Sequence, residues 1–235
     1  MHRHRALRLR YADPAETGRI LAYYEMNPSE FILARTRQQI AEAADHRMMV
    51  LLEYEGHMVG VSAMFDLEND ADGGVSSDSM TLEVGGTHIH RHFEGYGLQR
   101  ILFAVRSAMA LHGYGPEVSL ATVINPQNDK SLHNTRAAGF VRWDTPTEAL
   151  LSECAKCTKE KLPGSRCCSN YFILPREVQT KQVAQMLAES YGTNLLTRQN
   201  RRNNADMVTV SLSFGFLTGS RREALEEICG LRHFS

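Results

Sequence analysis

Long apolar runs are missing from this sequence. The longest apolar stretches, such as Met48 to Leu52, are far too short to span a lipid bilayer. The first ten residues, MHRHRALRLR, are basic and lack the apolar core of a signal peptide. We therefore expect a cytoplasmic protein with no membrane partner.

Cysteine is missing from the first 153 residues, and all five cysteines of the chain follow that point. An odd number of cysteines without a secretion signal argues against a disulfide framework. Four of them form two close pairs, Cys154 with Cys157 and Cys167 with Cys168. Two such pairs can bind one tetrahedral zinc ion, although adjacent cysteines chelate less well than Cys-x-x-Cys. Structural zinc, free packed cysteines and a redox disulfide are the alternatives for this cluster.

Neither sign of charge dominates, since the chain has 26 Lys and Arg against 27 Asp and Glu. Residues 1–150 carry 14 basic and 19 acidic side chains, whereas residues 151–235 carry 12 and 8. A hydrophobic content of 43% is typical of folded globular proteins, and we expect no dedicated nucleic-acid binder. Arg198, Arg201 and Arg202 lie in a segment that we expect to be a polar loop. They could hold an acidic acceptor or a nucleic-acid phosphate, or be solvated.

The apolar pattern of the first 145 residues predicts a strand, two helices, three antiparallel strands, a helix, a strand, a helix and a strand. The Asp13-Pro14-Ala15-Glu16 segment has the form of a capping box at a helix start. Gly85 and Gly86 lie inside a long predicted strand and indicate a β-bulge there. The predicted strands cover residues 6–11, 48–54, 58–65, 80–89, 118–124 and 140–143, and the predicted helices include 34–46 and 125–139.

Two motifs in this region carry chemical meaning. The first is HFEGYG at 92–97, between a predicted strand and a helix. A strand, a Gly-x-Gly turn and a helix make an anion site, because the turn amides and the helix N-terminus point at a bound phosphate. No Gly-Lys-Ser/Thr follows, and hairpins precede the turn, so neither a P-loop nor a dinucleotide fold fits. The second motif is NPQNDKSL at 125–132, closed by AGF at 138–140.

In these two motifs the sequence resembles the GCN5-related N-acetyltransferase (GNAT) family. That family's phosphate loop reads Gln/Arg-x-x-Gly-x-Gly/Ala, and both glycines match here while His92 takes the first place. The family's second signature is an Asn-rich helix that ends in Gly-Phe. The resemblance covers residues 6–145 and extends to a strand at 171–174. It implies an α+β fold in αβα layers, with a mixed, mostly antiparallel central sheet, a splayed strand with a bulge, and a C-terminal extension.

The resemblance also suggests how the chain is divided. We expect a GNAT-like acyl-CoA-binding core at 1–145, a Cys-containing insertion at 146–170, and the last core strand with a C-terminal α/β extension at 171–235. Within the extension we expect a helix at 177–190, an alternating strand at 207–216 and a closing helix at 221–229. That strand needs a sheet, either in this chain or in a partner, which leaves a homodimer open.

The donor that the resemblance implies is acetyl-CoA or another acyl-CoA. Its pantetheine arm would bond to the backbone that the bulge sets free, like an added strand. Asn128 has a second interpretation, as the N-cap of its helix. The implied donor-binding residues are Ile89, His90, Glu94, Gly95, Tyr96, Gly97, Leu98, Gln99, Asn128 and Ser131.

The reaction that the resemblance implies is direct transfer of the acyl group to an amine in a ternary complex. The amine would belong to a small molecule, a peptide or a protein. Glu83 precedes the bulge, where such enzymes often carry the carboxylate that takes up the amine proton. Thr135 stands where the family has an acidic Tyr, and a threonine hydroxyl is a poor acid. A catalytically inactive CoA-binding regulator is therefore one alternative. The Cys cluster and the basic C-terminal part leave a zinc-stabilised interaction module as the other.

Three histidines, His88, His90 and His92, alternate just before the glycine turn. On a strand they would face the same way. They could form a metal-binding pair, line the acceptor site, or lie on the surface.

Overall fold

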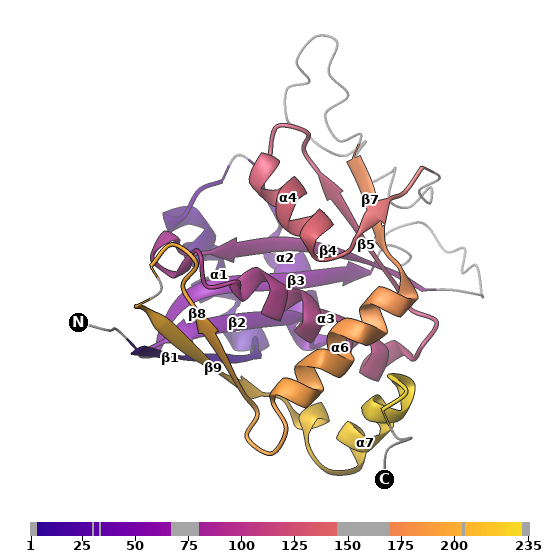
Figure 1. The fold of residues 1–235 in the computed structure, drawn as a ribbon. Helices are drawn as coiled ribbons and strands as arrows, with labels where there is room; N and C mark the ends of the chain where they lie inside the picture. The colour runs from indigo at the N-terminus through magenta and orange to yellow at the C-terminus, as the bar shows by residue number, and fades with distance from the viewer. Residues whose placement is uncertain are drawn as a thin grey trace.

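A mixed β-sheet forms the central layer of the described structure (Figure 1). The computed structural model describes residues 4–29, 31–32, 34–66, 80–144, 170–203 and 205–231. Across the sheet the strands follow the order β6-β7-β5-β4-β3-β2-β1-β9-β8. Their bounds are β1 His4–Tyr11, β2 Met49–Tyr54, β3 His57–Asp66, β4 Thr81–Ile89, β5 Ser119–Ile124, β6 Val141–Arg142, β7 Asn170–Leu174, β8 Leu195–Gln199 and β9 Met207–Ser213. Only β4 with β5 and β1 with β9 pair in parallel among these strands, which confirms the predicted mostly antiparallel sheet.

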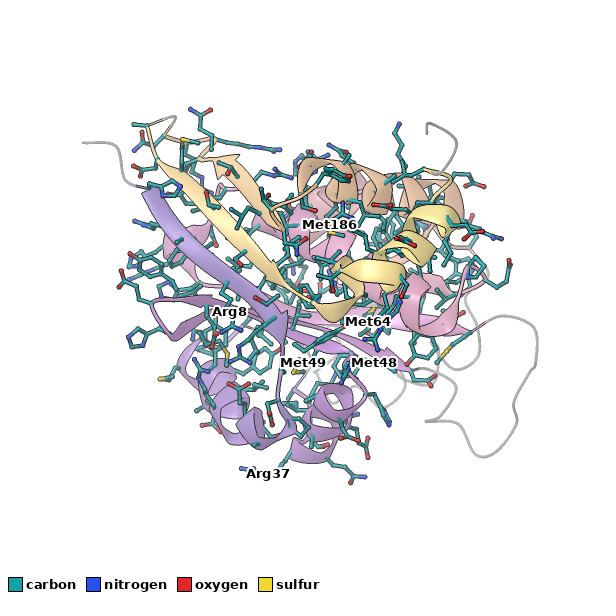
Figure 2. All side chains as sticks on the ribbon, turned by 90° about the horizontal axis from the view of Figure 1, so that it is seen from below. Arg8, Arg37, Met48, Met49, Met64 and Met186 are labelled. Atoms are coloured by element: carbon teal, nitrogen blue, oxygen red, sulfur yellow. The ribbon has the colours of Figure 1, made fainter. Side chains whose placement is uncertain are left out.

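Helices cover both faces of the sheet and make the three layers (Figures 1 and 2). The helices α1 and α2 pack on one face, and α3 with α6 and α7 covers the other. Their bounds are α1 Thr17–Met26, α2 Arg37–Asp45, α3 Leu98–Tyr114, α4 Asp129–Ala137, α6 Arg176–Glu189 and α7 Gly219–Ile228. In the described ranges, no helix is both long enough and apolar enough to cross a membrane.

The predicted capping box is present, at a short 3₁₀ turn that leads into α1. Asp13 accepts from the Ala15 amide at 2.8 Å, and the Glu16 carboxylate accepts from the Asp13 amide at 3.0 Å. Arg10 then binds Glu16 at 2.7 Å and Glu53 of β2 at 2.8 Å. The hydrogen bond from Arg10 is the main cause that lowers the pKa of Glu16 to about 2. This network fixes the helix start to the first two strands.

The predicted bulge lies in β4 and changes the course of that strand. Val61 of β3 pairs with His88, and Ala63 pairs with Gly85, so two residues of β4 face the single residue between them. On its other side β4 pairs with β5 only over Thr81–Glu83. The remaining two thirds of β4 therefore has a backbone edge that β5 does not use.

The C-terminal part joins the same sheet. β9 lies parallel to β1 over seven residue pairs, and β8 completes the edge beside β9. The sheet required by the alternating strand is thus in this chain. Two details of the prediction were wrong: the segment around Arg198 is strand β8, and β9 ends at Ser213. Phe214 instead enters a 3₁₀ turn and packs edge-on against Tyr11, with ring centroids 5.0 Å apart. The division into 1–145, 146–170 and 171–235 stays a prediction.

Candidate functional site

A pocket of about 570 Å³ lies beside the freed edge of β4. Its wall combines the loop after α1, the end of β4, the glycine turn, the first turns of α3 and α4, and two arginines of the C-terminal part. Segments from residue 28 to residue 202 thus meet in one place. The pocket joins the anion-binding motif to the end of β4 that β5 does not pair with.

The glycine turn has the backbone geometry of an anion site. Gly95 and Gly97 have φ of +86° and +69°, a region that favours glycine. Gly97 is the N-cap of α3, so the first amides of this helix have no intrahelical acceptor. The Glu94 amide already has an acceptor within the protein, because it donates to the Arg91 carbonyl at 3.2 Å. The amides available to an anion are thus those that follow Glu94.

The structure brings eight of the ten predicted donor-binding residues to this pocket. Tyr96 is different, since its side chain is 2% exposed and packs in the core. His90 is also different, because it lines another pocket together with His92. The eight lining residues are Ile89, Glu94, Gly95, Gly97, Leu98, Gln99, Asn128 and Ser131. Their part in donor binding stays a prediction.

The helix α4 brings Asn128, Ser131 and Asn134 to the pocket wall. Asn128 is the N-cap and accepts from the Ser131 amide at 3.0 Å, so the helix starts at Asp129 rather than at residue 125. Asn134 lies on the pocket wall and donates to the Gln99 side chain at 2.8 Å. Thr135 is 2% exposed and is not among the described lining residues. One step of 100° along the helix turns Thr135 into the core.

Glu83 lies on the stretch of β4 that still pairs with β5. Its carboxylate forms an ion pair with Arg35 at 2.9 Å, and Arg35 stacks over the Phe65 ring at 4.0 Å. Glu83 is 9% exposed and is not among the described lining residues of the pocket. The ion pair ties the loop after α1 to β4.

His88 lies in the bulged part of β4 and lines the pocket. Its Nδ1 is 2.9 Å from the Tyr23 hydroxyl of α1. Burial lowers the pKa of His88, and the positive charge on His90 lowers it further. The three histidines do not share one face, because the strand ends at Ile89 and His90 and His92 follow it on another side.

Comparisons of the sequence and of the fold give different results. By sequence, no family model and no curated protein matches the chain. By fold, it is similar to the aminoglycoside acetyltransferase AAC(6')-Ib in complex with coenzyme A and kanamycin, with a TM-score of 0.50 and 14% identity over 74% of this chain and 98% of that one. It is equally similar to Arabidopsis thaliana Naa50 in complex with the bisubstrate analogue CoA-Ac-MVNAL, with a TM-score of 0.50 and 14% identity over 71% and 96% of the two chains. The chain has the GNAT fold.

A buried arginine is among the residues near the pocket that were not predicted from the sequence. Arg106 of α3 is completely buried and donates to the Thr87 hydroxyl at 3.0 Å, directly under the bulge. Thr87 in turn lies 2.7 Å from the Ser62 hydroxyl and lines the pocket. Burial lowers the pKa of Arg106 to about 9. The signal in the sequence was a single basic residue inside the apolar stripe of a helix.

Metal binding concerns two groups of residues. The residues that the structure describes contain no group of three or more His, Cys, Asp or Glu that could hold a metal. Cys154, Cys157, Cys167 and Cys168 lie outside the described residues. The zinc prediction for these cysteines therefore stays a prediction.

Proposed function

We propose that this chain is an acyl-CoA-dependent N-acyltransferase that uses acetyl-CoA or a related donor. The observation that supports this proposal most is the separation of β4 from β5 after Glu83, directly beside the Gly95–Gly97 turn. A donor with a diphosphate at one end and an amide-bearing arm at the other matches both features. The arm would bond to the free edge of β4, and the diphosphate would lie on the amides of the turn.

The reaction requires the amine nitrogen to attack the thioester carbon, after which the carbon–sulfur bond breaks and the thiolate leaves. A base must take the proton from the amine. We assign this role to His88, because it lines the pocket and its lowered pKa keeps the imidazole neutral. With the ring proton on Nδ1, His88 donates to the Tyr23 oxygen, and its Nε2 lone pair is available to the amine. Glu83 is the alternative base.

The leaving thiolate is the second site of negative charge. In place of the expected tyrosine the chain has Thr135, which is buried away from the pocket. Arg106 offers a substitute, since its hydrogen bond to Thr87 reaches the pocket wall. A fixed buried cation stabilises nearby negative charge more strongly than a solvated one. We therefore assign to Arg106 an electrostatic role through Thr87.

The residues that line the pocket limit the chemical class of the amine acceptor. AAC(6')-Ib is an aminoglycoside acetyltransferase, and Naa50 was solved with a peptide-containing analogue. In the present pocket Glu94 is the one carboxylate among the described lining residues, against Lys130, Arg201 and Arg202. Phe31 and Ile32 form an apolar part of the same wall. We propose an amine with a neutral or apolar remainder rather than a polycation, because Glu94 is the sole carboxylate that the described lining offers to further positive charges.

An assay of amine-dependent release of the CoA thiol tests this function. The purified chain would be mixed with acetyl-CoA and, in turn, an apolar monoamine, a peptide with a free N-terminus, a lysine peptide and kanamycin. We expect release and an acetylated product, seen by mass spectrometry, with at least one of the first three and none with kanamycin. Product with kanamycin alone would contradict the assignment of the acceptor class.

A second candidate function is a CoA-binding regulator without catalysis. The observation that favours it is the burial of Thr135 at the place of the expected acid. Acetyl-CoA binding without thiol release for any amine in the panel would support the regulator over the enzyme.

A further inference from the structure

The loop between β8 and β9 is attached to the glycine turn by two hydrogen bonds, and a third hydrogen bond holds the loop together. The Arg201 amide donates to the Gly95 carbonyl at 3.0 Å, and the Asn200 side chain donates to the Glu94 carbonyl at 3.5 Å. The same Asn200 side chain accepts from the Arg202 amide at 2.8 Å. Asn200 is 9% exposed, so these contacts are largely shielded from water.

The glycine turn is shaped to accept this loop. A Cβ on Gly95 would lie 3.0 Å from the Asn200 side-chain oxygen, which is closer than about nine in ten real Cβ contacts, so Asn200 would have to move. Glycine is thus favoured at position 95 for two reasons. The turn requires a positive φ there, and the β8–β9 loop packs where a side chain would otherwise lie. Two segments more than 100 positions apart are therefore built as one unit.

This contact places two arginines at the wall of the pocket. Arg201 and Arg202 both line it, although they belong to a part of the chain beyond the acetyltransferase motifs. Arg202 Nη2 lies 3.8 Å from a Glu94 oxygen, and Lys130 of α4 binds the other Glu94 oxygen. Arg202 and Lys130 are 74% and 64% exposed, so both can turn toward a ligand. One carboxylate thus holds two cations beside the N-terminus of α3.

We propose that the β8–β9 hairpin completes a binding site for a phosphate ester, and that Glu94 is its internal counter-ion. Arg201 and Arg202 would bind the phosphate oxygens, since a guanidinium matches phosphate geometry with paired hydrogen bonds. A bound diphosphate would replace Glu94 as the partner of Arg202 and Lys130. The ligand is the diphosphate of an acyl-CoA if the proposed function holds, and this inference rests on that function for the ligand's identity.

Binding titrations of four variants test this site. Arg201→Ala and Arg202→Ala remove the proposed phosphate ligands, and Arg198→Ala is the matched control. Arg198 lies on the same hairpin but pairs with Glu189 at 2.6 Å and does not line the pocket. Glu94→Gln removes the internal counter-ion. Each variant would be titrated by calorimetry with CoA, with pantetheine, which has no phosphate, and with inorganic pyrophosphate, after a thermal melt has shown that it folds.

The expected results differ in sign among the variants. The Kd for CoA rises about tenfold for Arg202→Ala and for Arg201→Ala, as for a lost charge-assisted hydrogen bond. It falls several-fold for Glu94→Gln, because the phosphate no longer competes with a carboxylate. Arg198→Ala and all pantetheine titrations stay at the wild-type values. Wild-type affinity for CoA in both Arg201→Ala and Arg202→Ala would overturn the proposal.

The pyrophosphate titration separates this inference from the proposed function. Pyrophosphate binding that depends on Arg202, in a chain that does not bind acetyl-CoA, would keep the phosphate site and remove the acyl donor. Acetyl-CoA binding that is indifferent to both arginines would keep the donor and overturn the role of the hairpin.

Discussion

Gly86 fulfils two requirements of the bulge at a single position. Its φ is +57°, and a Cβ there would lie 2.9 Å from the Tyr24 hydroxyl, which itself donates to the Gly86 carbonyl at 2.5 Å. Alanine would therefore be strained in its backbone and would push Tyr24 away. The sequence predicted the bulge, but it gave no sign that the contact comes from α1.

We expect Gly86→Ala to lower the free energy of unfolding by about 1–3 kcal/mol, from the left-handed conformation and the displaced tyrosine together. Gly113→Ala is the control, because Gly113 lies in α3 with nothing within 4 Å of its Cβ position. That change should be neutral or slightly stabilising. Urea denaturation measures both, and equal stability of the two variants would contradict the account of the bulge.

His88 and Glu83 can be distinguished by kinetics once an acceptor is known. We expect His88→Gln to lower kcat by about 10²–10⁴-fold, the range for loss of a general base. Because the pKa of His88 is lowered, the acid limb of the kcat profile of the wild type should lie below pH 6.5 and be absent in the variant. A wild-type kcat for His88→Gln together with a large loss for Glu83→Gln would reverse the assignment.

At the scale of elements, the order of strands and helices was predictable because it depends on local patterns. Capping boxes, glycine turns and apolar alternation all lie within a few neighbouring residues. β8 was not predictable, since its sequence LLTRQ does not alternate cleanly and only the edge of β9 makes it a strand. On α4 Asn134 lines the pocket, whereas Thr135, the position compared with the family's tyrosine, is turned into the core.

The link between β1, β2 and the start of α1 gives a pH-dependent prediction. The pKa of Glu16 is about 2 in the folded chain and 4.5 is its ordinary value. Its charge therefore stabilises the fold fully above pH 4.5, and this contribution is lost as the pH falls toward 2.

We expect Glu16→Gln, which can keep the capping box, to lower the free energy of unfolding at pH 7 by about 1 kcal/mol. The difference from the wild type should shrink between pH 4.5 and pH 2. Thermal melts over this range measure it. A difference that does not change with pH would show that the charge of Glu16 has no part in stability.

At the scale of the whole molecule, the C-terminal part completes both the sheet and the candidate site. β9 bonds to β1, and the loop beside it bonds to the glycine turn 106 positions earlier in the chain. A pattern of neighbouring residues cannot predict a contact between segments so far apart in the chain. For this reason the sequence predicted the amides and the α4 side of the pocket. It left open whether Arg201 and Arg202, in an expected polar loop, bind an acidic group or are solvated.

A single cooperative unfolding transition should follow from this architecture. Leu212 of β9 is 3% exposed, and Leu212→Ala should lower the stability of the whole chain by about 2–5 kcal/mol. Met207→Ala, at a position that is 39% exposed, should cost under about 0.5 kcal/mol. Denaturation followed by circular dichroism and by fluorescence tests this. Two separate transitions, with one of them unmoved by Leu212→Ala, would show that the extension folds independently.

The central claim is that an acyl-CoA binds between β4 and β5 with its diphosphate on the glycine turn. Calorimetric titration with acetyl-CoA tests it most directly, in the wild type, in Gly97→Glu and in Gly113→Glu. The last two add the same charge to α3 or its cap, one inside the pocket and one outside it. We predict micromolar binding by the wild type and by Gly113→Glu and none by Gly97→Glu. Absence of binding in a well-folded wild type, or equal binding by both variants, would contradict the claim.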